Sequence, residues 1–591
     1  MPNPNFYSAF IRTLPWRPRK ALGALFWHLT GRKVRARNRL RMAASQSPLA
    51  YAQWIDTVER SDETIAAAAS VMAAWASRPR FSVIADTVAP PDETWVRRLI
   101  TALNHQCYDH WELILCGPGA PSMPLDDDPR VRFANCPADG ETSSLPCGIA
   151  AASGDFVLPI IPGASLPPTA LYRYAEALQD DPDADLLFGD EDQADNRNRR
   201  SHPWFKPRWN EEMFLSQDYV SHACAIRTES ARMILPLITE RGTAAAYALI
   251  LRLIADPSAR IVHIPHVQCH LAGPTPNNIA AHTRTVAAHL AATAPGATVT
   301  SAPFDTVHVS WPLPSDPPLV SIIIPTRDKM KLLRACVASV LEHTNYAPFE
   351  VIIIDNGSIE PNALRYLEEI SHYDNVKVLP YDYPYNYSAI NNFAVQHAKG
   401  DYLCLLNNDT EVIDACWLAE LMRQAVRPHV GAVGAKLLYA DGSIQHAGVV
   451  VGMGGAAGHA HRFLRNDKPG YFRQAHIAQY VSAVTAACLV VEKAKFLAVG
   501  GLDEEALQIA FNDVDLCLKL ERAGWRNVYA PRAVMIHHES KSRGKDFSPK
   551  HIDRYLRELA VLQTRWETKT YRDPLHHPEL DPASETFVIR L

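Results

Sequence analysis

The sequence predicts an α/β protein built from two similar domains, each with a mostly parallel β-sheet. Three observations lead to this fold class. Short apolar runs alternate with amphipathic stretches, which is typical of strands buried between helices. The same order of elements occurs twice, once from Phe81 and again from Val320. The chain of 591 residues is also too long for a single core, because domains usually hold ~100–200 residues.

The repeat is visible when the two halves are compared. The second half has "VSIIIPTRDKMKLLRACVASVLEHTNYAPFEVIIIDNG" and the first has "FSVIADTVAPPDETWVRRLITALNHQCYDHWELILCGPG", with strand, turn, amphipathic helix and strand at nearly the same spacing. Further on, "AVQHAKGDYLCLLNNDT" matches "GIAAASGDFVLPIIPGA", each a helix that closes near Gly400 or Gly154 and is followed by a buried strand. Sheets of this kind bind ligands at the carboxyl ends of their strands.

The domain boundaries follow from changes in composition. Residues 296–318 contain "APFDTVHVSWPLPSDPPL", which is rich in proline and lacks periodicity, so we expect a linker there. The remaining segments are an N-terminal helical extension, 1–78; a first domain, 79–295; a second domain, 319–545; and a C-terminal helical extension, 546–591.

Composition indicates a folded protein of a reducing compartment. Hydrophobic residues make up 47% of the chain and charged residues 21%, which argues against disorder. The 11 cysteines form no CxxC pair, and several lie within apolar runs. We find neither an apolar run long enough to span a bilayer nor a signal-peptide pattern, so we expect a cytoplasmic protein.

Residues 1–42 are strongly basic and hold no acid, although the whole chain has a net charge of −5. Leucine and aromatic residues of "ALGALFWHL" lie between the basic clusters, which favours an anionic membrane surface over nucleic acid as the partner. This interpretation places the protein peripherally on the inner face of the cytoplasmic membrane. The alternative is a helix that packs these residues onto the protein and exposes a basic face to solvent.

Polar side chains collect at strand ends in the second half. Asp355 ends "VIIID", where it can bind a base or ribose, or can instead form an Asx turn. Asp409 follows the strand "LCLL" after Asn407 and Asn408. A single carboxylate is enough for Mn²⁺ or Mg²⁺ if a diphosphate supplies the remaining charge, but Asp409 can also cap the next helix.

Two later motifs add further candidates. Asp513 and Asp515 lie at a helix start and diverge, so one can act as general base while the other caps the helix or holds the fold. In "MIHHESKSRGK", His537 and His538 lie on opposite faces of a strand end, so one of them can complete a metal site. The basic residues that follow, Arg543 among them, suit a leaving diphosphate.

Together these stretches resemble glycosyltransferase family 2, the inverting enzymes of GT-A fold. The resemblance rests on "SIIIPTRD", "VIIIDNGS", "YNYSAINNFAVQHAKGDYLCLLNNDTEVI", "VTAACLVVEKAKFLAVGGLDE", "FNDVDLCLKLERAGWRNVYAP" and "IHHESKSRG", in the right order over nearly all of residues 318–545. It implies two tandem GT-A, Rossmann-like domains, and a sugar transfer from a nucleoside diphosphate sugar with Mn²⁺ or Mg²⁺ as cofactor.

The resemblance also implies a role for each matching residue. These are Pro325, Thr326, Asp355, Asn407, Asn408 and Arg543 for the donor, Asp409 and His537 for the metal, and Asp513 as the base that deprotonates the acceptor hydroxyl. Asn407 stands in place of the first acid of the family's DxD motif, and Asn512 stands in place of the Glu that usually precedes the base. The glycine-rich stretch from Gly452 to Phe463 would be a mobile loop near the acceptor.

The implied function is inverting transfer of a hexosyl or rhamnosyl group to a glycan or lipid-linked glycan. Similar enzymes build bacterial surface polysaccharides of the O-antigen and rhamnan type. Asp513 would take the acceptor proton, and the metal on Asp409 would stabilise the departing nucleoside diphosphate without a covalent enzyme intermediate.

The first copy lacks this chemistry. Comparison of the halves puts Ile161, Pro162 and Gly163 at the position of the DxD motif, Gly117 at that of Asp355, and Ala245 and Ala246 at that of Asn512 and Asp513. We therefore expect a degenerate first domain without transferase activity. Asp190, Glu191, Asp192 and His270 remain there, which leaves a separate weak site open.

Two other classes of protein compete with the transferase. One is a non-catalytic glycan-binding or scaffold protein in a polysaccharide assembly complex, against which the intact acids of the second half speak. The other is a nucleotidyltransferase, but the sequence has no glycine-rich and basic phosphate loop after the first strand.

Overall fold

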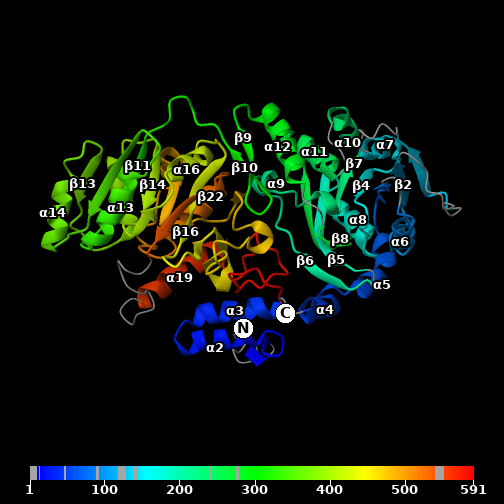
Figure 1. Cartoon of the computed structure of the whole chain (residues 1–591), viewed down its shortest axis with the longest axis horizontal. Coiled ribbons are helices and arrows are strands. Elements are labelled where there is room, and N and C mark those ends of the chain that lie inside the picture. The colour runs from blue at the N-terminus through cyan, green and yellow to red at the C-terminus, as the bar shows by residue number, and fades with distance from the viewer. Residues whose placement is uncertain are drawn as a thin grey trace.

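The computed structural model describes residues 10–11, 13–45, 48–87, 92–117, 128–136, 144–195, 197–238, 243–274, 278–538 and 552–590. Two sheet-centred bodies lie side by side, as Figure 1 shows. The N-terminal helices lie beneath them, and the C-terminal segment runs between these helices and the sheets.

The first body has a sheet of the order β3-β2-β1-β4-β7-β5-β6, with β8 also paired to β5. Its strands are β1 (Phe81–Asp86), β2 (Trp111–Gly117), β3 (Val131–Asn135), β4 (Phe156–Ile160), β5 (Leu186–Ala194), β6 (Arg200–Trp204), β7 (Cys224–Arg227) and β8 (Ile261–Leu271). Its helices are α6 (Glu93–Asn104), α7 (Ser144–Ala151), α8 (Ala170–Asp180), α9 (Glu211–Ser216), α10 (Thr228–Ile234), α11 (Thr243–Leu253) and α12 (Ile279–Thr293).

The second body has a sheet of the order β13-β12-β11-β14-β21-β16-β22-β15. Its main strands are β11 (Val320–Thr326), β12 (Phe349–Asp355), β13 (Val376–Pro380), β14 (Tyr402–Leu406), β15 (Thr410–Val412), β16 (Val430–Leu438), β21 (Cys488–Glu492) and β22 (Arg526–His537). Shorter strands are β17 (Ile444–His446), β18 (Val449–Val451), β19 (Ala457–His459) and β20 (Gln479–Tyr480). Its helices are α13 (Met330–Glu342), α14 (Pro361–Ile370), α15 (Tyr387–His397), α16 (Trp417–Ala425), α17 (Lys493–Ala498) and α18 (Asn512–Arg522).

The two sheets share one topology. The path β3-β2-β1-β4-β7-β5-β8 corresponds strand by strand to β13-β12-β11-β14-β21-β16-β22. In both, the first four strands are parallel, and β7 or β21 runs antiparallel to its neighbours. The central strands β1, β2, β11 and β14 are almost entirely buried, because helices cover both faces. The predicted α/β fold class, with mostly parallel sheets and helical termini, is confirmed. The two sheets of one topology support a division into two domains, which stays a prediction together with its boundaries.

The segment expected to be an irregular linker contains a β-hairpin. Strands β9 (Thr298–Ala302) and β10 (Thr306–Ser310) pair antiparallel, and Val307, Val309 and Trp311 join the core of the first body. The alternation of Val307 and Val309 is a strand signal. It was missed because it spans only five residues between prolines.

The terminal segments tie the two bodies together. The N-terminal helices are α2 (Pro18–Leu29), α3 (Lys33–Ser45), α4 (Pro48–Trp54) and α5 (Ser61–Met72), with a π-helical turn at Ile55–Glu59. The C-terminal helix is α19 (Ile552–Trp566). One apolar cluster joins Trp54 and Phe205 from the N-terminal half to Val450, Leu580 and Phe587.

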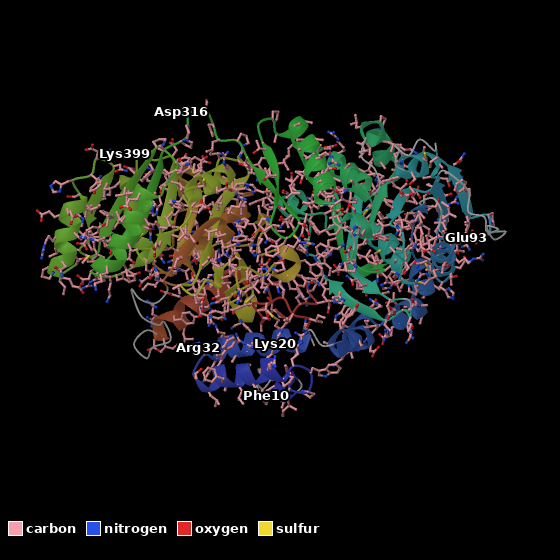
Figure 2. The ribbon with its side chains drawn as sticks, in the orientation of Figure 1. Phe10, Lys20, Arg32, Glu93, Asp316 and Lys399 are labelled. Carbon is pink, nitrogen blue, oxygen red and sulfur yellow. The ribbon has the colours of Figure 1, made fainter. Side chains whose placement is uncertain are left out.

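The basic N-terminal segment is largely docked on the protein. Arg35 pairs with Asp441 at 3.1 Å, and Arg41 donates to the carbonyl of Ala583 at 2.6 Å. Lys20 and Arg32 mark the α2–α3 pair beneath the rest of the chain in Figure 2. In the part of the chain that the structure describes, no helix has both the length and the apolar character needed to cross a bilayer.

Candidate active site

The predicted donor residues meet at the ends of three neighbouring strands. Pro325 and Thr326 end β11, and Thr326 lies beside Asp355 at the end of β12. Asn408, just beyond β14, donates from Nδ2 to Oγ1 of Thr326 at 2.9 Å. Strand pairing and this hydrogen bond thus bring residues far apart in the sequence to one edge of the sheet.

Asp355 forms the Asx turn that the sequence left open. Its Oδ1 accepts from the backbone N–H of Ser358 at 3.0 Å and from the hydroxyl of Ser358 at 2.5 Å. The side chain remains half-buried at the sheet edge. The turn therefore holds the carboxyl group at the edge and does not exclude a role in donor binding.

Asp409 and His537 face each other at the far end of the sheet. The pairing of β15 with β22 sets Thr410 opposite His537, which brings His537 Nε2 to 3.1 Å from Asp409 Oδ1. The two residues are only 3% and 9% exposed. A separation of 3.1 Å between a carboxylate oxygen and an imidazole nitrogen suits two ligands of one small ion, so the donor set fits Mn²⁺ or Mg²⁺.

Gln445 orients the imidazole of His537. Gln445 belongs to the buried strand β17, and its Oε1 lies 2.7 Å from His537 Nδ1. An amide oxygen only accepts, so Nδ1 carries the proton and Nε2 presents a lone pair toward Asp409. His538 points elsewhere and pairs with Glu411 at 3.1 Å. Of the two histidines, the geometry therefore favours His537 as ligand.

Asp513 opens into a cavity of about 250 Å³ that Asn407 also lines. Its Oδ2 accepts from the backbone N–H of Ala486 at 3.1 Å, and burial raises the pKa of Asp513 above its ordinary value. A carboxylate with a raised pKa is a stronger base, so Asp513 is suited to remove a proton from a hydroxyl group in this cavity.

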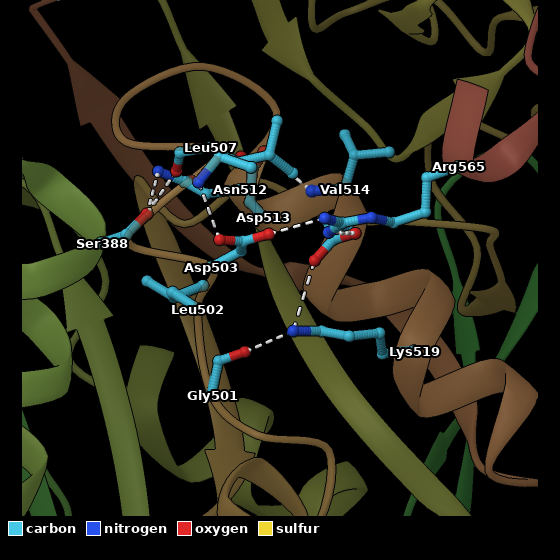
Figure 3. Close-up of polar contacts among 12 residues, drawn as sticks. Ser388, Gly501, Leu502, Asp503, Leu507, Asn512, Asp513, Val514, Lys519 and Arg565 are labelled. Carbon is cyan, nitrogen blue, oxygen red and sulfur yellow. Dashed lines mark hydrogen bonds and ion pairs between the residues drawn. The ribbon is translucent and has the colours of Figure 1, made fainter. Parts of the chain in front are cut away.

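The neighbours of Asp513 hold the start of α18 in place. Asn512 donates to Ser388 Oγ at 3.1 Å, and Arg565 of α19 bridges Asp503 at 2.7 Å and Asp515 at 2.8 Å, as Figure 3 shows for Asn512 and Arg565. Asp515 is fully buried. The two acids of α18 thus divide their roles: Asp515 fastens the C-terminal helix, and Asp513 faces the cavity.

The C-terminal helix also shapes the cavity wall. Glu558 accepts from the backbone N–H groups of Ile509 and Ala510 at 3.2 and 2.8 Å, and Tyr555 lines the cavity itself. Neither residue was predicted, because the sequence of α19 shows only the pattern of an amphipathic helix. The residues that Glu558 and Tyr555 contact lie in a segment far away in the sequence. Together with Gln445, Glu558 and Tyr555 are among the site residues that the sequence did not reveal.

The glycine-rich stretch lies at the cavity, as expected. Ala457, Gly458 and His459 line it. The loop is anchored, however, because Gln563 and Thr568 both donate to the carbonyl of Gly455 at 2.9 Å. These contacts favour a held loop over the freely mobile one that was expected.

The first sheet lacks the site at the corresponding places. The strand registers align Gly117 with Asp355. Because β4 pairs with β1 in the same register as β14 pairs with β11, Gly163 aligns with Asp409. In the first sheet Ser165 pairs with His270, and in the second sheet the equivalent Glu411 pairs with Ile536. The next residue along the strand is Leu271 in the first sheet and His537 in the second, so Leu271 occupies the position of His537. Ala245 and Ala246 are packed in the core.

One acid–histidine cluster does occur in the first body. Asp190 lies between His263, at 3.2 Å, and His577 of the C-terminal segment, at 2.8 Å. The backbone N–H of Glu579 donates to His577 Nδ1 at 3.0 Å, so the neutral ring carries its proton on Nε2, facing Asp190. Nε2 therefore has no lone pair for a metal, and the cluster is better explained as a buried acid held between two imidazole rings.

Comparison with known proteins gives the family. The model of glycosyl transferase family 2 matches residues 321–487, the part that carries Thr326, Asp355 and Asp409. The N-acetylglucosaminyl-diphospho-decaprenol L-rhamnosyltransferase of Mycobacterium tuberculosis is 30% identical over 39% of this chain and 78% of that protein. The chain belongs to glycosyltransferase family 2. The family membership confirms the resemblance found in the sequence.

Two longer relatives match most of this chain. An uncharacterized protein of Sinorhizobium fredii is 37% identical over 86% of this chain, and the O-antigen biosynthesis protein RfbC of Myxococcus xanthus is 35% identical over 84%. The chain spans only 58% and 40% of the length of these two relatives. Arg543, predicted to meet the diphosphate, lies outside the described residues.

Proposed function

We propose that this chain is an inverting glycosyltransferase that moves a sugar from a nucleoside diphosphate sugar to a glycan or lipid-linked glycan. The observation that carries the proposal is the placement of Asp513, with its raised pKa, in one cavity with Asn407, next to the Asp409–His537 pair. A base, a metal-ligand pair and a strand-end donor pocket are the parts that such a transfer needs.

Each group of residues would have its own role in the transfer. Thr326, Asp355 and Asn408 would hold the nucleoside of the donor, while Asp513 accepts the proton of the acceptor hydroxyl as its oxygen attacks the anomeric carbon. A Mn²⁺ or Mg²⁺ ion held by Asp409 and His537 would supply positive charge to the leaving diphosphate. No covalent bond to the enzyme forms, so the configuration inverts.

The pathway is proposed from the relatives. One is named for O-antigen biosynthesis and another for rhamnosyl transfer to a diphospho-decaprenol-linked sugar. These names support synthesis of a bacterial surface polysaccharide and a hexosyl or rhamnosyl donor. A cytoplasmic location fits the pathway, because nucleotide sugars are the predicted donors.

We further propose that the first body has no transfer activity. It retains the strands but has Gly117, Gly163 and Leu271 at the places of Asp355, Asp409 and His537. Glycine and leucine can neither bind a cation through a side chain nor accept a proton. The first body would then serve packing and binding.

A membrane contact through α2 is also proposed. Leu22, Phe26 and Leu29 form one helix face and are 55%, 62% and 74% exposed; we call them the α2 apolar face. Exposed apolar residues next to basic ones are typical of helices that lie on anionic membranes. The docking of Arg35 and Arg41 on the protein leaves this face of α2 outward.

The test of transfer is release of nucleoside diphosphate from a panel of nucleotide sugars. We expect metal-dependent turnover or slow hydrolysis by the wild type, loss of both Mn²⁺ binding and turnover in Asp409→Asn, and loss of turnover alone in Asp513→Asn. Asp190→Asn is the matched control in the first body. Turnover that survived both second-body variants but not the control, in folded protein, would overturn the assignment. Absence of binding and turnover with every donor would instead favour a glycan-binding scaffold.

A further inference from the structure

The cavity of Asp513 is lined by a histidine that has no role in the proposed transfer. His459 ends β19, and the pairing of β19 with β18 places His459 opposite Val449. Both residues line the cavity. The backbone N–H of the next residue, Ala460, donates to the carbonyl of Gly448 at 3.0 Å, so the end of β19 is held beside the start of β18.

A buried residue of β17, His446, holds the ring of His459. The Nδ1 atoms of the two rings are 2.9 Å apart, which is a hydrogen bond in which one ring donates and the other accepts. His446 is fully buried, and its Nε2 has no hydrogen-bond partner in the described part of the chain. The bond to His459 is thus the one hydrogen bond that explains a polar ring at this place in the core.

Neighbouring side chains of β17 serve two parts of the candidate site. Gln445 bonds His537 of the proposed metal pair, and the next residue, His446, bonds His459 of the cavity. Successive side chains of a strand point to opposite faces, so one short strand can reach both. The position of His446 therefore ties the orientation of His459 to the same framework as the metal pair.

The bond between the two rings decides how His459 can meet a ligand. Because Nδ1 is engaged by His446, a ligand meets the ring at Nε2. If His446 donates, Nε2 of His459 carries a proton and donates; if His459 donates, Nε2 accepts. A hydroxyl group can bond either form, because it both donates and accepts. Hydroxyl groups therefore suit His459 in either tautomer.

The charge of the cavity favours a neutral ligand. Among the described residues that line it, none is a lysine or an arginine, whereas Asp513 is an acid. A ligand carboxylate or phosphate in this space would lie near that acid without a cation to compensate it, which is unfavourable.

The size and the aromatic wall of the cavity suit a single sugar ring. Phe511 and Tyr555 both line it, and their ring centroids are 5.4 Å apart. The volume of about 250 Å³ lies below the roughly 300–1,000 Å³ of pockets for drug-sized ligands. A sugar ring has C–H groups on its faces for the aromatic rings and hydroxyl groups at its edge for Asp513 and His459. An alkyl chain could pack on the rings but offers no hydroxyl group to either residue.

We propose that this cavity takes one neutral sugar residue at the acceptor end of the glycan, and that His459 Nε2 bonds a hydroxyl group other than the one that reacts. His446 is then a positioning residue, which acts on the sugar through His459. This acceptor site rests on the proposed transfer, because it lies at the same base, Asp513.

Binding of methyl glycosides to the full chain, without donor or metal, tests the acceptor site. The probes are methyl glycosides of rhamnose, mannose, galactose and N-acetylglucosamine at millimolar concentration, measured by saturation-transfer difference NMR and calorimetry, with methyl glucuronide as the anionic comparison. We expect at least one neutral glycoside to bind and the glucuronide not to bind. His459→Leu should lower the affinity roughly tenfold, the size of one good hydrogen bond. His397→Leu, the same change at an exposed histidine of α15 outside the cavity, should bind as the wild type.

His446→Phe tests the positioning role. It keeps a ring in the core and removes a buried nitrogen that has no partner, so its thermal midpoint should stay near that of the wild type. We expect a several-fold lower affinity for the glycoside. We also expect ¹⁵N spectra of histidine-labelled protein to show mixed His459 tautomers where the wild type shows one; the signal that disappears in His459→Leu identifies His459. Unchanged affinity with an unchanged tautomer would refute the positioning role.

A double variant protects the test against a loss of fold. His459→Leu leaves Nδ1 of His446 unpaired, whereas His446→Phe combined with His459→Leu removes both partners, which is nearly neutral for stability. The double variant should fold and show the same tenfold loss of glycoside affinity. Wild-type affinity in the double variant, or binding of the glucuronide in preference to every neutral glycoside, would overturn the acceptor site.

The outcomes also separate the acceptor site from transfer itself. Asp409→Asn, which changes a residue outside the cavity, should lose turnover and keep the glycoside affinity. Turnover by the wild type without binding of any neutral glycoside would overturn the acceptor site and leave transfer standing. Glycoside binding that depends on His459, without turnover from any donor, would support the sugar site and overturn transfer.

Discussion

Gln445 offers the sharpest test of the proposed metal site, because it contacts His537 but does not line the cavity of Asp513. In Gln445→Met the 2.7 Å bond to His537 Nδ1 is lost, and that buried N–H is left unpaired at a cost of about 1–3 kcal/mol. The ring can escape this cost by moving its proton to Nε2, toward Asp409 3.1 Å away. Either outcome penalises the tautomer that binds metal.

We expect Gln445→Met to weaken Mn²⁺ binding by about 10–100-fold, or roughly 1.4–2.7 kcal/mol. The free Mn²⁺ signal in electron paramagnetic resonance measures this affinity directly, with and without a nucleoside diphosphate. Turnover at limiting Mn²⁺ should fall by a similar factor and recover when Mn²⁺ is raised.

Two variants make the result specific. Gln445→Glu keeps an acceptor oxygen of the same reach and should bind Mn²⁺ within a few-fold of the wild type. His538→Gln, which breaks only the pair with Glu411, should have no effect on Mn²⁺. Wild-type affinity in Gln445→Met, or an equal loss in Gln445→Glu, would refute the tautomer reasoning.

Three further predictions concern catalysis, stability and the membrane. Asp513→Asn should lower kcat by about 10²–10⁴-fold with Mn²⁺ affinity unchanged, and should abolish the fall in rate as pH drops through the raised pKa; a retained acidic limb would contradict the base assignment. Burial raises the pKa of Asp573 to about 6, so its contribution to stability is complete below pH about 4 and is lost above pH about 6, by roughly 3 kcal/mol. Thermal midpoints across this range should show that loss in the wild type and not in Asp573→Asn, and parallel curves would contradict it. Glutamine at all three residues of the α2 apolar face should release the protein from phosphatidylglycerol vesicles in co-sedimentation, whereas Leu364→Gln, an exposed leucine of α14, should not; equal binding by both would refute the membrane contact.

The fold could be predicted because its signals are local and repeated. Each buried strand of the two sheets is an apolar run next to an amphipathic helix, and the internal repeat doubled the evidence. The hairpin β9–β10 was missed because prolines surround strands of five residues each. A short alternating pattern gives a weak signal when turn residues flank it.

The site could be predicted only in part. Asp409, His537 and Asp513 are polar residues at element ends, and the sequence singled them out for that reason. Gln445 of β17 bonds His537, which lies 92 residues away in the sequence. Glu558 of α19 bonds Ala510 and Ile509, which lie 48 and 49 residues away. The functions of Gln445 and Glu558 arise from tertiary packing, which no local pattern encodes.

The acids that remain in the first body can be explained by their structural partners, without a role in transfer. Residues Asp190–Asp192 are buried, and each has its own partner: Asp190 meets His577 of the C-terminal segment, Asp192 accepts from the hydroxyl of Tyr51 in α4 at 2.7 Å, and Glu191 pairs with a buried lysine at 2.8 Å. Burial opposes their charge, but these partners outweigh it and hold the pKa of Glu191 down to about 2. Removal of one partner would leave an unpaired buried charge, which would destabilise the fold. The acids fasten α4 and the C-terminal segment around His577 to the first sheet, and this segment follows α19, which shapes the cavity of Asp513. The first body, which we propose to lack transfer activity, can thus still contribute to the geometry of the proposed active site.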